Sequence, residues 1–151
     1  MKDVHVECNP DEVLVKKLGV SRKRITHHQG KSRVFKACQK KNNLLALVDE
    51  DPGSHRTPYE NTLTLEEQYQ GISYYKDRSG NEIFILNGKL EDWIISICQE
   101  SKVEIATFGL PGRPNDLHDV INQKLDKFAV LLDALLEAGS PALVRLRSWL
   151  N

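Results

Sequence analysis

The sequence predicts an α/β fold in which a mostly parallel, open β-sheet carries helices on both faces and is followed by a helical C-terminal extension. Two observations favour this class. Strand-like and helix-like segments alternate three times in the first half of the chain, and the third strand-like segment, LLALV at 44–48, contains no polar residue. An unbroken apolar run of this length is typical of a strand that is covered on both faces.

Length and composition favour a single domain over 1–151, with an α/β core at 3–100 and the helical extension at 110–151. The chain has 151 residues, of which 40% are apolar and 28% charged, as in an ordinary globular protein. Its apolar runs are far shorter than the roughly 20 residues of a membrane span, and the N-terminal MKDVHVECN has no apolar signal core. A cytoplasmic location without a membrane partner is therefore the default expectation.

The elements of the first half are justified by alternation and by turn residues. β-Branched alternation in DVHVE indicates a strand that ends at Glu7, Asn9-Pro10 is typical of a helix start, and Gly30 turns the chain before another helix. The predicted elements are strands at 3–7, 24–28 and 44–48 and helices at 9–18 and 32–41.

The second half begins with a polar loop, PGSHRTPYEN, and the segment after it, LTLEEQYQ at 63–70, is expected to form a short helix. ISYYKD and NEIFILNG flank Arg78-Ser79-Gly80 and predict an antiparallel hairpin. Helical spacing then predicts a helix at 89–101, a long helix capped by Asn115, and a short last helix that ends in Trp149.

Acidic residues follow three of the predicted strands. Glu7 ends the first strand, Asp49 to Asp51 leave the third, and Glu91 and Asp92 begin the helix after the last strand. The functional cleft of an open parallel sheet lies beyond the carboxyl ends of its strands, so these acids should gather at one edge. Carboxylate oxygens without a histidine or cysteine at metal spacing favour Mg²⁺ or Mn²⁺ over zinc.

Asp49 and Asp51 are the central pair of this prediction. Side chains two residues apart in extended backbone point to the same side, so both should reach one cation while Glu50 points away. The structural alternative is that each acid pairs with a lysine, caps a turn or favours a helix N-terminus. Agreement among three strand ends favours the metal site, with Asp49, Asp51, Glu7, Glu91 and Asp92 as candidate ligands.

The order of these segments resembles the Toprim domain of topoisomerases, bacterial primases and OLD-type nucleases. The matching elements are VHVE with Glu7, HHQG with Gly30, and ALVDED with Asp49 and Asp51; they cover about 3–100, and NGKLEDWI is similar to a segment of small standalone Toprim-like proteins. The resemblance implies that Glu7 acts as acid or base in nucleotidyl transfer or phosphodiester cleavage and that the two aspartates hold Mg²⁺. The chain differs from the family in having Cys8 after the glutamate and Gly53 two residues after the D-x-D motif.

A basic segment precedes the acidic one. Residues 1–42 contain 11 Lys and Arg against 4 Asp and Glu, and residues 43–100 contain 4 against 11. A Gly-Lys-Ser turn that opens a helix offers backbone N–H groups and a positive dipole end to a phosphate, and basic side chains add a grip on nucleic acid that is independent of its sequence. The candidate phosphate and nucleic-acid residues are Gly30, Lys31, Ser32, Arg33, Arg24, His28, His55 and Arg56, and Lys89 joins Glu7 as a candidate catalytic residue.

Three functions are compatible with these patterns. The leading hypothesis is a Mg²⁺- or Mn²⁺-dependent Toprim-like enzyme that cleaves or transfers nucleic-acid phosphodiesters, most simply a nuclease of DNA or RNA. The second is a non-catalytic nucleic-acid-binding or regulatory module on the same scaffold; the short chain favours this module, or an enzyme that acts as a homodimer or with a partner protein. The third is a phosphotransfer domain with an aspartate as phosphoacceptor.

Overall fold

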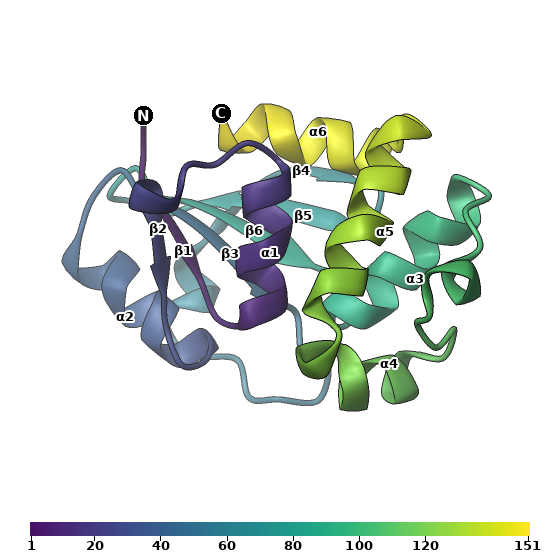
Figure 1. The fold of residues 1–151 in the computed structure, drawn as a ribbon. Helices are drawn as coiled ribbons and strands as arrows, with labels where there is room; N and C mark the ends of the chain where they lie inside the picture. The colour runs from purple at the N-terminus through teal and green to yellow at the C-terminus, as the bar shows by residue number, and fades with distance from the viewer.

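The computed structural model describes residues 1–151 and contains one six-stranded sheet with helices on both faces (Figure 1). The strands are β1 (Val4–Val6), β2 (Ile25–His27), β3 (Leu45–Asp49), β4 (Thr64–Tyr69), β5 (Ile72–Lys76) and β6 (Glu82–Leu86). They follow the order β2-β1-β3-β6-β5-β4 across the sheet. β1 pairs in parallel with β2 and β3, and β3 pairs in parallel with β6, whereas β5 is antiparallel to β6 and β4. The predicted open, mostly parallel α/β fold is confirmed.

The helices divide between the two faces of this sheet. They are α1 (Asn9–Lys17), α2 (Lys31–Lys40), α3 (Leu90–Glu100), α4 (Pro114–Val120), α5 (Leu125–Glu137) and α6 (Pro141–Leu150). On β3, Leu45 and Leu47 belong to the core layer that contains α1, α3, α5 and α6, while Ala46 and Val48 belong to a second layer with α2. Both faces of β3 are therefore covered, which explains why its sequence has no polar residue.

The segment 63–70 is a strand, so the helix expected there is wrong. β4 forms an antiparallel hairpin with β5, and the two residues that connect them, Gln70 and Gly71, have φ of 49° and 77°. A two-residue turn with both φ values positive matches the right-handed twist of paired strands. Pairing with β5 therefore overrides the helix preference of the glutamates in LTLEEQYQ.

The long helix expected from Asn115 is in fact two helices, α4 and α5, joined by a 3₁₀ turn at Ile121–Gln123. Lys124, with φ −130° and ψ 35°, leaves the helical conformation. Val120, Ile121 and Asn122 have weaker helix propensity than Gln123, Lys124 and Leu125, which follow them. The break lets α4 pack against α3 while α5 packs against α1. It also brings α4 to the carboxyl edge of the sheet.

None of the helices reaches the length and apolar character that a membrane crossing requires.

Asn81 ties the basic helix α2 to the central strands. Its side chain is fully buried, its Oδ1 accepts from the backbone N–H of Leu44 at 2.8 Å, and its Nδ2 donates to the carbonyls of Cys38 and Lys41. Three backbone groups at the end of α2 and the start of β3 thus depend on one amide, because buried polar groups are costly without partners.

We expect Asn81→Ala to lower the free energy of unfolding by about 2–4 kcal/mol, because it leaves these backbone groups buried without partners. Urea denaturation followed by circular dichroism measures the change. Asn42→Ala, at an exposed position two residues before Leu44, serves as the control and should stay within about 0.5 kcal/mol of the wild type. Equal effects of the two substitutions would contradict the assigned role of Asn81.

Candidate metal centre

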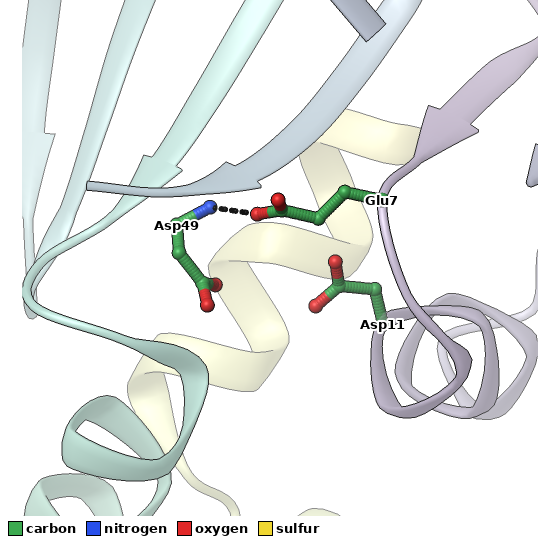
Figure 2. A group of neighbouring side chains, drawn as sticks. All are labelled: Glu7, Asp11 and Asp49. Carbon is green, nitrogen blue, oxygen red and sulfur yellow. Dashed lines mark hydrogen bonds between the residues drawn. The ribbon is translucent and has the colours of Figure 1, made fainter. Parts of the chain in front are cut away.

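Three carboxylates meet where β1 and β3 end. The parallel register of Val4 with Leu45 and of Val6 with Leu47 brings the carboxyl ends of the two strands side by side. Glu7 follows β1, Asp49 ends β3, and Asp11 lies in the first turn of α1. One oxygen from each carboxylate lies within 4.8 Å of the others, and the three side chains converge on one space in Figure 2.

Glu7 is fixed in this arrangement by the backbone of the neighbouring strand. Its Oε1 accepts a hydrogen bond from the N–H of Asp49 at 2.7 Å (Figure 2). This bond ties the end of β1 to the last residue of β3. It leaves the second oxygen of Glu7 available to a ligand.

Asp11 is the member that sequence reasoning missed. Its residue is 0% exposed, and neither of its carboxylate oxygens has a hydrogen-bond partner; Oδ1 of Asp49 also has none. The sequence showed Asp11 only as an acid that favours a helix N-terminus. However, it starts the helix that leaves β1, just as Glu91 starts the helix that leaves β6, so the same strand-end argument would have found it.

Burial and mutual repulsion destabilise the ionised forms of all three groups. Burial raises the pKa of Glu7, although the N–H of Asp49 partly opposes that shift. Burial and then the charges of Asp49 and Glu7 raise the pKa of Asp11 well above its usual range, and burial with the charge of Glu7 raises the pKa of Asp49. Buried, unpartnered carboxylates are costly, and a divalent cation is the partner that compensates all three at once.

A hollow of about 340 Å³ lies beside the cluster. Its lining includes Glu7 and Asp49 together with Asp51, Lys89, Glu91 and His118. The structure thus brings together five of the residues that the sequence singled out as ligands or catalytic groups. Only two of its ten lining residues are hydrophobic and four are acidic, so the hollow suits a charged ligand.

Asp51 borders this hollow but does not join the three-carboxylate cluster. β3 ends at Asp49, and Asp51 has a left-handed φ of 51°. The extended geometry on which the prediction for Asp49 and Asp51 depended therefore does not reach Asp51. Glu50 points away as expected, with its Oε1 accepting from the N–H of Gly88 at 2.9 Å.

Glu91 and Asp92 have different environments. Glu91 is 4% exposed, and its Oε1 lies 2.5 Å from Nδ1 of His118. Asp92 is exposed, and its Oδ2 accepts from the backbone N–H of Lys89 at 2.9 Å, as a helix-capping side chain does. The structure therefore places Asp92 in the cap of α3 and Glu91 in a pair with a histidine, and neither belongs to the three-carboxylate cluster.

The predicted phosphate residues lie in several places. Gly30 turns the chain before α2 with a φ of 102°, and Ser32 and Arg33 are exposed on that helix. Lys31 donates to the carbonyl of Glu50 at 2.9 Å and pairs with Glu60 at 3.1 Å. Lys31, Arg56 and Asp51 line a second hollow, of about 310 Å³, so Asp51 borders both hollows.

Three further predicted residues, like Gly30, Ser32 and Arg33, line neither hollow. Arg24 is buried at the amino end of β2, where its guanidinium donates to the carbonyls of Lys2 and Leu150. His28 is half-buried, with its Nε2 2.7 Å from Nδ1 of His5. His55 is exposed on the loop after β3.

Comparison of the chain with protein-family models, with curated proteins and with solved structures finds no match.

The raised pKa values of the three carboxylates predict a stability that depends on pH and on cations. Groups with a raised pKa in the folded state stabilise it fully below their unfolded pKa of about 4, and this contribution is lost as pH rises through the folded values. In EDTA, the melting temperature should fall between about pH 4.5 and pH 8, and Mn²⁺ at pH 8 should restore it. Thermal unfolding by circular dichroism over this pH range tests both effects.

Asp11→Asn removes the most buried of these charges while it keeps the volume of the side chain. In EDTA at pH 8 we expect this variant to melt at a higher temperature than the wild type, with a flatter pH dependence, and Mn²⁺ to stabilise it less. Differential scanning calorimetry measures all three quantities. An Asp11→Asn protein that follows the wild-type pH profile would show that the pKa of Asp11 is the same in the folded and unfolded states, which would contradict its assigned burial among the other carboxylates.

Proposed function

We propose that the protein is a Mg²⁺- or Mn²⁺-dependent, Toprim-like phosphodiester hydrolase that acts on nucleic acid, most simply a nuclease. The observation that carries this proposal is Asp11, fully buried beside Glu7 and Asp49 with both carboxylate oxygens unpartnered. A buried carboxylate without hydrogen bonds is rarely retained for stability, because its desolvation is not offset by any contact within the chain.

The donor set determines the class of cation. Glu7, Asp11 and Asp49 offer only oxygen atoms, and hard oxygen donors prefer Mg²⁺ or Mn²⁺ to zinc. These cations retain several waters when few protein ligands hold them. A cation held by Asp11 and Asp49 beside Glu7 would polarise a phosphoryl oxygen and neutralise charge in the transition state.

The location of the cluster supports a substrate with phosphate groups. It lies at the carboxyl edge of the parallel strands, where ligands of open α/β sheets bind. Lys89 lines the hollow of about 340 Å³ beside the three carboxylates, which we call the acidic hollow. Lys31 and Arg56 line the second hollow, which Asp51 also borders. α2 begins at the same edge and contains no acidic residue in its sequence KSRVFKACQK. Cationic groups on both sides of an anionic centre suit a polyanion that passes over it.

Glu7 has the properties of a proton acceptor in this hydrolysis. Its carboxylate lines the hollow beside the three-carboxylate cluster, where a water that attacks phosphorus would lie. With one oxygen held by the N–H of Asp49, the other can take a proton from the water that attacks phosphorus. The same position matches the role that the Toprim resemblance implies for this glutamate.

The proposal is tested with labelled single- and double-stranded DNA and RNA, incubated with the protein in Mg²⁺, Mn²⁺ or EDTA. We expect cation-dependent cleavage, and a loss of about 100-fold or more in rate for Asp49→Asn and for Asp11→Asn, because each removes a charge from the cation site. Glu50→Gln is the matched control: it is the neighbouring acid, points to Gly88, and keeps its hydrogen-bond acceptor.

Cation binding is measured separately by isothermal titration calorimetry with Mn²⁺. Binding should stabilise the folded wild type by about 1.4 kcal/mol at a free ion concentration about ten times Kd, and Asp11→Asn should bind far more weakly. Salt-sensitive nucleic-acid binding without cleavage would favour the non-catalytic module instead. Absence of both Mn²⁺ binding and cleavage would refute the proposed function.

A further inference from the structure

A carboxylate and an imidazole form one wall of the acidic hollow. Glu91 lies in the first turn of α3, and His118 lies on α4, 27 residues further along the chain. Oε1 of Glu91 and Nδ1 of His118 are 2.5 Å apart. The side chain of Glu91 is 6% exposed, whereas that of His118 is 55% exposed. The carboxylate of Glu91 is thus buried, whereas the imidazole of His118 is exposed to solvent.

This contact fixes the roles of the two ring nitrogens. A carboxylate only accepts hydrogen bonds, so Nδ1 of His118 carries the proton that the pair shares. The ring is held at Nδ1, and its other nitrogen, Nε2, makes no hydrogen bond within the chain. A histidine whose Nδ1–H is held by a buried carboxylate, with Nε2 toward the ligand, is an arrangement used for proton transfer.

The pair lies in the same hollow as the cation site. His118 and Glu91 line it together with Glu7, Asp49, Asp51 and Lys89. The other charged residues near His118 in sequence are Asp116 and Asp119 of α4, both exposed. Glu7, the proposed proton acceptor, therefore has a second proton-active group in its hollow, contributed by a distant part of the chain.

We propose that Nε2 of His118 is the general acid of the hydrolysis and that Glu91 is its positioning residue. This role rests on the proposed phosphodiesterase function. Water forms a bond to phosphorus and gives its proton to Glu7, while the bond from phosphorus to the leaving oxygen breaks. The imidazolium of His118, protonated at both ring nitrogens, gives its Nε2 proton to that oxygen, which leaves as an alcohol. Glu7 then releases its proton to solvent, and Nε2 of His118 takes one up.

The leaving group provides the sharpest test. A sugar hydroxyl is a poor leaving group and needs a proton, whereas 4-nitrophenolate is stable without one. We expect His118→Gln to cleave an oligonucleotide about 100-fold more slowly than the wild type, but to lose less than about threefold on bis(4-nitrophenyl) phosphate. Glu91→Gln should show the same selectivity with a smaller loss, about tenfold on the oligonucleotide.

The wild-type pH–rate profile on the oligonucleotide should have a descending limb at high pH that His118→Gln lacks. Asp119→Asn, an exposed acid next to His118, is the matched control and should behave as the wild type. Mn²⁺ binding by calorimetry should remain in the His118 variant.

The two proposals fail in different ways. If the wild type cleaves and His118→Gln loses equally on both substrates, or on neither, His118 is not the general acid, and the hydrolase proposal stands. If the wild type neither binds Mn²⁺ nor cleaves, the hydrolase proposal fails and the role of His118 fails with it. Loss of Mn²⁺ binding in His118→Gln would show that the imidazole supports the cation site and would also overturn the proposal.

Discussion

The parallel pairing of β1 with β3 is the constraint on which the site depends. It brings two strand ends together so closely that the carboxylate of Glu7 accepts from the backbone of Asp49. The same pairing directs α1 back over the sheet, so that Asp11 in its first turn is buried between the two strand ends. The three carboxylates therefore converge because β1 and β3 pair in parallel, although the carboxylates repel one another.

Keeping these three carboxylates together lowers the stability of the folded state. The rest of the core is well matched: both faces of β3 are covered by apolar layers, and Asn81 satisfies three backbone groups where α2 meets the sheet. Against this background the unpartnered oxygens of Asp11 are an exception. Local rules are usually broken at functional sites, where a ligand supplies what the chain lacks.

Much of the fold could be predicted from the sequence because local pattern and tertiary context agree there. The apolar run of β3 and the flanks of the hairpin identify buried and paired strands directly. LTLEEQYQ was mistaken for a helix because edge-strand pairing depends on a partner that composition does not reveal. The long C-terminal helix breaks at Lys124 for a similar reason, since packing against two different helices decides its course.

The sequence could predict the site only through residues that follow the ends of strands, because strand ends can be located from the sequence. The strand-end argument applies to Glu7, Asp49 and Glu91 and extends to Asp11, but which of these acids share one space is a property of the folded chain. Arg24 shows the reverse case. Its place in a basic segment suggested phosphate, but it directly precedes the parallel strand β2 and therefore lies at the amino edge of the sheet, where it donates to the carbonyls of Lys2 and Leu150.

The hollow beside the three carboxylates is lined by two distant parts of the chain. Its carboxylate cluster comes from residues 7–49, whereas His118 belongs to the C-terminal helices. α4 is a short helix of 7 residues, and short peripheral elements open locally at a lower free energy than a central sheet does. A chain with α4 released would keep the three carboxylates together but lack the imidazole of His118, so the two sides of the hollow belong to different cooperative units of the same domain.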